Sequence, residues 1–587
     1  MAKAATSASI PDLSGSSSAV NIHNALSPAL EAVGSRPRRA QRRPTKQTSY
    51  DLTNHAKAYL EGGQYASGYD FLYSLLAAGT SVSTPAQPYI GFLAPPAYLA
   101  YASSMIADPK FTTKAQSTDA VKGADAALRY LQCVHTTIDA PAYPTIRKAF
   151  TFPEERNRRR APGHRNAESL SPRLGGDVER IAGEAANQKS LWYCADDFWH
   201  IVGWAFNCSV AHKKRWSRWK LWVSTMLDFL ESDWEVCVRR SQEDEDVREA
   251  ILQESLVWHY IVGDESIPTQ RLRRRRIVKA IHATATPESR KDYPEIWSRE
   301  TLEPQRKKDH QPVGKVDFET GEIGDYDSDE EMQDVSEMDV DADDDTSSTT
   351  SEDGIKNLRD AVEQLGGQDS IELRQRMIAL LAQVALALPS SFTPFFDLCD
   401  NILEDFNQLP TITYAVLIST SKMPDRLQIA SNANLLHPLI SGKPPNYFLY
   451  EPTQSDFETK LFPLRGTTQS FALNAKISLV LEQMFMYMVD QDALTPTDKL
   501  RKAIETGIEA RRGVHGTSRG AKGNPEEETQ AKGLMEACAA RLLGLLEVLE
   551  MAAGMAPQPK GEAAAFLSFG TGSSLSPAPD SDTEGDD

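Results

Sequence analysis

The sequence predicts an all-α protein in which two helical halves are separated by an acidic insertion. Apolar residues recur at three- and four-residue steps in most hydrophobic segments, which is the period of an amphipathic helix. Prolines and glycines punctuate these segments. The insertion is marked by its charge, because residues 325–353 contain fourteen carboxylates and no lysine or arginine. We therefore expect a helical domain at residues 49–300, a linker at 301–354 and a second helical domain at 355–555.

The linker and both ends of the chain are predicted to be disordered. The acidic segment 325–353 supplies fourteen of the nineteen net negative charges, and charge repulsion with few apolar side chains opposes a packed core. Residues 1–48 are rich in serine, alanine and proline and end in a basic cluster, and residues 556–587 are acidic. Residues 151–187 are polar and rich in arginine, proline and glycine, so we expect a flexible excursion within the first domain.

The first folded segment is expected to be a helical hairpin over residues 54–78. Apolar and aromatic residues follow the helical period on both sides of Gly62-Gly63, and Gly79 is a natural stop. The small and aromatic positions of residues 54–79 resemble one tetratricopeptide unit. No 34-residue period continues it. The resemblance implies, as one alternative, that the halves are α-solenoids of the tetratricopeptide or HEAT kind.

Further helices are expected over residues 95–107, 119–137, 190–260, 268–285, 371–388, 472–489 and 526–555. Residues 410–422 contain Thr-Ile-Thr-Tyr-Ala-Val-Leu-Ile, which suits a strand or a buried helix, and the helical surroundings favour a helix. Another helix is predicted to begin after Thr495, since threonine is a good N-cap and Pro496 suits a first helical position.

All nine tryptophans lie between Trp192 and Trp297. One predicted face carries Trp219, Val223, Met226, Leu230, Trp234 and Cys237 at steps of three and four. Burial of each large aromatic side chain stabilises a fold by roughly 1.5–3 kcal/mol. The favoured interpretation is therefore that the tryptophans form the core of the first domain.

A functional alternative exists for the same helix. Four basic residues are interleaved with Trp216, Trp219 and Trp222 and are candidate nucleic-acid contacts: Lys213, Lys214, Arg215 and Arg218. Aromatic rings can stack on bases while basic groups hold phosphates. Basic side chains also simply solvate the outer face of an amphipathic helix, and that interpretation is favoured.

Two other basic clusters are candidates for a nuclear import signal or an anion contact. The first contains Arg36, Arg38, Arg39, Arg42 and Arg43. The second contains Arg273, Arg274, Arg275 and Arg276, flanked by Arg271 and Lys279. On a helix this second run spreads around most of the circumference, so it is a candidate partner for nucleic acid or for the acidic insertion. A solvated helix end is the alternative.

Zinc-ligand residue types occur at Cys194, His200, Cys208 and His212. Their surroundings are strongly apolar and lack the tight turns of a structural zinc site, so we interpret them as core residues and predict no metal and no cofactor. The six cysteines are scattered, as is usual in a reducing compartment.

Ser328, Ser581 and Thr583 are embedded in acidic sequence and are candidate sites for an acidophilic kinase of the casein kinase 2 type.

No nucleotide-binding, metalloprotease or nucleophile-elbow motif occurs, and no apolar run is long enough for a membrane span. The predicted function is a non-catalytic scaffold or adaptor subunit of a nuclear complex, in chromatin maintenance, transcription or ribosome assembly. Its expected partners are proteins, with histones or basic assembly factors contacting residues 325–353, and no membrane. Direct nucleic-acid binding through residues 213–222 and 271–279 is the alternative function.

Overall fold

The computed structural model confirms the all-α class. It describes residues 42–84, 86–153, 180–243, 245–263, 269–302, 357–516 and 525–555. Among these residues the only strands are β1 (Thr45–Gln47) and β2 (Gly91–Leu93), which pair in parallel. The acidic segment 325–353 lies outside the described residues, as do the tails 1–41 and 556–587 and residues 154–179 of the predicted excursion.

The helices of the first half follow the expected order. They are α3 (Tyr50–Glu61), α4 (Tyr65–Ala77), α5 (Pro96–Ala107), η1 (Pro109–Phe111), α6 (Thr118–Thr137), η2 (Ala140–Ala142), α7 (Tyr143–Ala149), η4 (Asn187–Lys189), α9 (Leu191–Cys194), α10 (Phe198–Ala211), α11 (Lys213–Ser241), α12 (Arg248–Gln253), α13 (Leu256–Val262), α14 (Gln270–Ile281) and α15 (Pro287–Asp292). The predicted hairpin over residues 54–78 corresponds to α3 and α4, and α11 is the longest helix of this half.

The second half is also helical. Its elements are α16 (Leu358–Gln364), α17 (Gln368–Ala387), α18 (Phe395–Gln408), α19 (Thr411–Ser419), α20 (Asp425–Leu436), α21 (Gln454–Asp456), η5 (Phe457–Leu461), α22 (Phe471–Asp490), α23 (Asp498–Arg512) and α24 (Pro525–Ala552). The prediction of a buried helix rather than a strand over residues 410–422 is confirmed by α19, in which all but the last residue are buried.

The predicted start of α23 is wrong by two residues. The N-cap is Thr497, whose side chain accepts a hydrogen bond from the backbone N–H of Leu500 at 3.1 Å. Thr495 instead donates its backbone N–H and its hydroxyl to the side-chain oxygen of Gln454, both at 2.9 Å. Both threonines are good caps by type. The tertiary contact with Gln454 decided between them.

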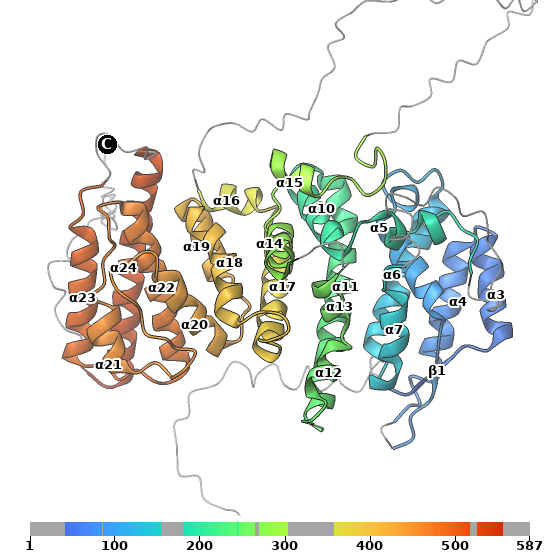
Figure 1. Ribbon diagram of the computed structural model, residues 1–587, viewed down its shortest axis with the longest axis horizontal. Helices are drawn as coiled ribbons and strands as arrows, with labels where there is room; N and C mark the ends of the chain where they lie inside the picture. Colours follow the sequence, from blue (N-terminus) through green and yellow to red (C-terminus); the bar gives the residue numbers. More distant parts are fainter. Residues whose placement is uncertain are drawn as a thin grey trace, which may run out of the picture.

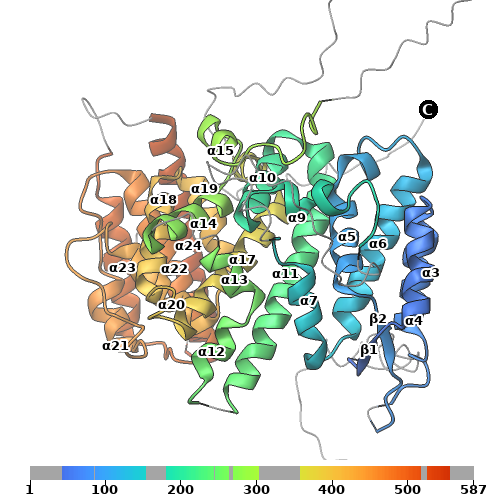
Figure 2. The same ribbon diagram turned by 45° about the vertical axis from the view of Figure 1, so that its right-hand side comes forward.

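The helices lie side by side in an elongated row, with α3 at one end and α23 at the other (Figure 1). Some helices touch partners that are close along the chain, as in the pairs α3–α4 and α10–α11, and others touch more distant partners, as in the pairs α10–α14 and α11–α17. The turned view shows the same succession, with α10 and α15 lying above α11 (Figure 2). Such a row exposes helix faces along its whole length.

The tryptophan-rich segment forms a core, as predicted. Seven of its nine tryptophans are buried: Trp192, Trp199, Trp204, Trp216, Trp219, Trp222 and Trp234. The whole predicted face of α11, from Trp219 to Cys237, is buried with them. Trp219 packs edge-on against Trp222 and stacks with Trp297, which brings the end of the first half onto α11.

The two halves share one hydrophobic core, which runs without a break from α3 to α24. Helix α17 packs on α11 and α14, and its Arg376 pairs with Asp228 and Glu231 of α11 at 2.7 Å each. Gly366, just before α17, has φ +90°, and a Cβ there would lie 1.9 Å from the hydroxyl oxygen of Ser209. Only glycine therefore allows this close approach of the second half to α10.

Four buried arginines connect neighbouring elements through the same kind of hydrogen bond. Arg43, Arg215, Arg374 and Arg511 are at most 2% exposed, and each donates to backbone carbonyls at or just beyond the end of another helix or turn. The last carbonyls of a helix have no partner within it, and a guanidinium offers five N–H donors. The clearest case is Arg374 of α17, which donates to Ile281 and Ala283 at the end of α14.

Candidate anion-binding cleft

Helix α14 forms because its local sequence supplies a cap and an apolar face. The side chain of Thr269 accepts a hydrogen bond from the backbone N–H of Leu272 and caps the N-terminus. Its buried residues are Ile277, Val278, Ala280 and Ile281, which face α10, α17 and α18. The remaining circumference is available to the basic residues.

The outer face of α14 borders an open cleft of about 480 Å³. From α14 it is lined by Leu272, Arg275, Arg276 and Lys279, which follow the 3-1-3 spacing of one helical face. Asp292 and Tyr293, at the end of α15, form the opposite wall. Three cations and one carboxylate thus face the same space.

The cations of the cleft differ in their partners. Arg276 pairs with Asp197 at 3.0 Å and lies over the ring of Tyr293, and Lys279 pairs with Asp292 at 3.0 Å. The ion pair with Asp197 raises the pKa of Arg276 against the opposing effect of burial. Arg275 is exposed and has no ion pair within the described residues. It is therefore the cation most available to an anionic ligand.

The other two arginines of the predicted run turn away from the cleft. Arg273 and Arg274 are half-buried, and Arg274 donates to the hydroxyl of Thr393 at 2.9 Å, in the segment before α18. The structure therefore divides the run, with Arg275 and Arg276 on the cleft and Arg274 in the junction between the halves.

The predicted nucleic-acid contacts on α11 are used within the fold. Arg215 is buried and pairs with buried Glu300 at 2.7 Å. Arg218 pairs with Asp125 at 2.5 Å, and Lys213 pairs with Glu363 at 3.3 Å. Lys214 is exposed. Arg215 therefore does not belong to the outer surface on which a nucleic acid would lie.

The N-terminal basic cluster is also divided. Arg43 is buried and donates to carbonyl oxygens of Leu76 and Ala78 at the end of α4, so it is not open to an import receptor. Arg42 is exposed, with its guanidinium near the hydroxyls of Tyr143 and Ser232 at 3.3 and 3.4 Å. The remaining residues of the cluster, Arg36, Arg38 and Arg39, lie outside the described residues, as do the candidate phosphosites Ser328, Ser581 and Thr583.

Of the four residues with zinc-ligand side chains, His200 and Cys208 are buried in the core, whereas Cys194 and His212 are half-buried. His200 has both ring nitrogens engaged, Nδ1 by the backbone N–H of Asp196 at 3.0 Å and Nε2 by the carbonyl of Pro294 at 2.9 Å. Cys208 is fully buried, and burial raises the pKa of its thiol. No group of three or more metal-ligating side chains is assembled in the part of the chain that the structure describes.

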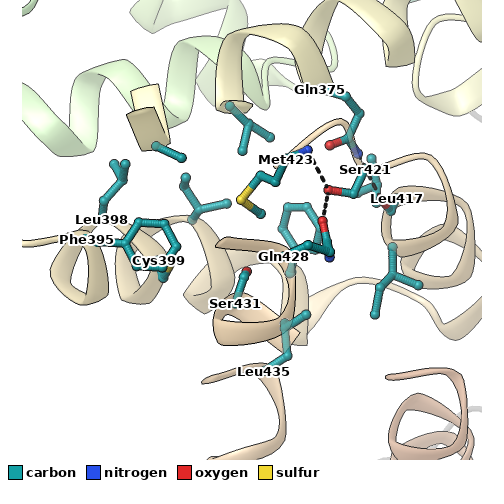
Figure 3. Close-up of a pocket in the computed structure, with 15 residues that line it drawn as sticks. Gln375, Phe395, Leu398, Cys399, Leu417, Ser421, Met423, Gln428, Ser431 and Leu435 are labelled. Atoms are coloured by element: carbon teal, nitrogen blue, oxygen red, sulfur yellow. Dashed lines mark hydrogen bonds between the residues drawn. The ribbon is translucent and has the colours of Figure 1, made fainter. Parts of the chain in front are cut away.

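A second, apolar cavity lies in the other half, among α17, α18, α19 and α20 (Figure 3). Its walls are mostly aliphatic and aromatic, and its polar edge is formed where Ser421 donates to the side-chain oxygen of Gln428. The enclosed volume is about 30 Å³. A space of this size holds on the order of one water molecule, so we assign it to packing rather than to ligand binding.

The sequence pointed to the cations of the cleft but not to its walls. The spacing of Leu272, Arg275, Arg276 and Lys279 could have revealed one helical face that carries three cations, because these positions lie on the same side of a helix. Nothing in the local sequence places Tyr293 or Asp197 against that face. Those contacts follow from the packing of α10 and α15.

Comparisons with known proteins found no match for the chain. No protein-family model matches it, no curated protein is similar to it, and no solved structure matches its fold. Among the described helices, none combines the length and apolar character that a membrane crossing requires.

Proposed function

We propose that the protein is a non-catalytic helical scaffold or adaptor subunit of a nuclear complex, acting in chromatin maintenance, transcription or ribosome assembly. The observation that carries the proposal is the continuous core through both halves of the elongated row. Because the halves share this core and buried arginines bridge neighbouring helices, the row holds its exposed faces at fixed separations. Fixed separation of docking surfaces is what a scaffold requires.

The use of the charged side chains supports the same proposal. Arg215, Arg374 and Arg147 are committed to structural contacts with carbonyls or carboxylates of other helices. These contacts favour the observed packing, because in another arrangement the same buried donors would be left unpaired. The acidic residues 325–353 would supply the contact with histones or basic assembly factors, since fourteen carboxylates are a strong electrostatic partner for a basic surface.

Direct nucleic-acid binding, the alternative, depends chiefly on the α14 cleft, because Arg215, Arg218 and Lys213 of α11 are paired within the fold. It predicts that affinity for RNA or DNA falls steeply with salt, because each neutralised phosphate releases counterions. A salt series with the full chain tests it. Absence of binding at low salt would exclude it.

The scaffold proposal is tested by affinity purification of the tagged full chain, followed by mass spectrometry and by imaging of a fluorescent fusion. We expect nuclear fluorescence and recovery of histones or basic assembly factors. A variant with residues 325–353 replaced by a glycine-serine segment of equal length should lose those partners. Recovery of chaperones and metabolic enzymes alone, with cytosolic fluorescence, would contradict the proposal.

A further inference from the structure

The cleft on α14 carries positive charge that the described fold does not match. Arg271, Arg275 and Lys279 are exposed and follow one another at four-residue intervals, so they form a stripe along the outside of the helix. Only Lys279 has an ion pair within the described residues, with Asp292. Arg275 and Lys279 line the cleft, and Arg271 lies one helical turn before Arg275, outside the lining residues. A stripe that continues the cleft in this way, with Arg271 and Arg275 unpaired within the described residues, is suited to an anionic chain.

We propose that this cleft is the docking site of the chain's own acidic segment Asp325–Glu331. The segment reads Asp-Tyr-Asp-Ser-Asp-Glu-Glu, with carboxylates at positions 325, 327 and 329 on alternate residues. The inference goes beyond the scaffold proposal, since the contact would form whatever complex the protein belongs to.

The spacing of the charges supports this occupant. Residues four apart on a helix are separated by about 6 Å along its axis. Alternate residues of an extended chain project to the same side about 6.6 Å apart. An extended Asp325–Asp329 would therefore place its three carboxylates opposite Arg271, Arg275 and Lys279 in register.

The connectivity supports the same occupant. The described part of the first half ends at Leu302, nine residues after Tyr293 on the wall of the cleft, and twenty-two residues separate Leu302 from Asp325. A linker of that length has a root-mean-square span of roughly 25 Å if flexible. Tethering at such a length gives an effective concentration on the order of millimolar, which compensates for the modest strength of exposed ion pairs.

The other basic surface is less suited to the segment. On α11, Lys213 and Arg218 already have carboxylate partners, Glu363 and Asp125, and Arg215 is buried. An acidic ligand there must displace existing ion pairs. At Arg271 and Arg275 no pair within the described residues has to be broken.

Zero-length carbodiimide cross-linking of the full chain, read by mass spectrometry, tests the contact directly. We expect an amide between the Lys279 amine and a carboxylate of residues 325–331, suppressed in about 1 M salt, where the screening length falls to about 3 Å. The Lys279–Asp292 pair at 3.0 Å is the internal control for reactivity. Cross-links from residues 325–331 to Lys213 or Lys214 instead would overturn the proposal.

A binding experiment gives an independent test. In the full chain, the segment is neutralised by Asp325→Asn, Asp327→Asn, Asp329→Asn, Glu330→Gln and Glu331→Gln. A fluorescent peptide of residues 322–334 should then bind at least about tenfold more tightly than to the wild type, because a tethered competitor has been removed. Equal affinity for both proteins would overturn the proposal.

A charge reversal locates that binding. Adding Arg275→Glu to the neutralised chain should abolish the gain, whereas Lys502→Glu, an exposed reversal within α23, should leave it intact. Thermal unfolding of each variant checks that the fold is kept. If the tighter peptide binding survives Arg275→Glu, this cleft is excluded as the docking site. That outcome would not affect the scaffold proposal, which is tested separately by the recovery of partners.

Discussion

The basic residues of α11 and those of α14 are similar in sequence, and the fold uses them differently. On α11, Lys213, Arg215 and Arg218 all reach carboxylates contributed by distant segments. On α14, Arg275 stays exposed beside an open cleft. A dense run of cations therefore does not by itself mark a binding surface. What decides is whether the fold brings carboxylates to it.

The largest effect is expected for Arg215→Ala, which breaks the buried ion pair of α11. Glu300 would be left buried beside no cation, and removal of one partner of such a pair costs roughly 3–5 kcal/mol. Chemical denaturation followed by tryptophan fluorescence should show this loss at pH 8. A loss below about 1 kcal/mol, the range of exposed pairs, would show that Arg215 is no more structural than its neighbours.

The pH dependence of that variant provides its control. Burial raises the pKa of Glu300 to about 7 despite the opposing charge of Arg215. Without Arg215 the carboxyl should hold its proton still more strongly, so the destabilisation should grow as the pH rises above 7 and should level off below 7, where Glu300 is protonated in both proteins. A double variant, Arg215→Met with Glu300→Leu, should recover the part of the lost stability that comes from the unpaired Glu300 carboxylate, while the carbonyl of Ala107 remains without its donor.

A smaller effect is expected at the buried end of α14, where His282 follows the helix. Burial and the nearby Arg374 lower the pKa of His282 to about 3, whereas the unfolded side chain titrates near 6.5. The neutral ring therefore contributes stability that is fully present above pH 6.5 and is lost as the pH falls towards 3. The slope for one such group is at most about 1.4 kcal/mol per pH unit.

The variant His282→Phe removes this titration and keeps an aromatic ring near Phe406, with which His282 makes an edge contact. Unfolding curves at pH 7, 6, 5 and 4 should show the variant losing less stability than the wild type over that range. If the stability of both proteins changed with pH in parallel, the buried end of α14 would tolerate a positive charge on His282.

The smallest effect should separate the two surfaces. Arg218→Ala removes a partly exposed ion pair with Asp125 and should lower the free energy of unfolding by about 0.2–1 kcal/mol. The same variant, made in the segment-neutralised chain, should bind the peptide of residues 322–334 with unchanged affinity. Arg275→Ala should change stability by less than about 0.5 kcal/mol and weaken that binding. If Arg218→Ala weakened peptide binding and Arg275→Ala did not, α11 rather than α14 would carry the binding surface.

Much of the helical framework could be predicted, and the reasons are local. The hairpin at α3 and α4, the buried helix α19 and the tryptophan face of α11 all follow from apolar spacing along single segments. The start of α23 was misplaced because Thr495 and Thr497 are equally good caps by type. A contact with Gln454, more than forty residues away, separated them.

The sequence by itself determined the all-α class and the buried face of α11, because helical periodicity and capping depend on residues within a few positions of one another. The tertiary structure alone decided which arginines are structural and which face solvent. Arg215 meets Glu300 from 85 residues away, Arg374 caps α14 from the other half, and Arg275 meets no carboxylate within the described residues. Such partners are fixed by the packing of helices, and no spacing within one segment encodes them.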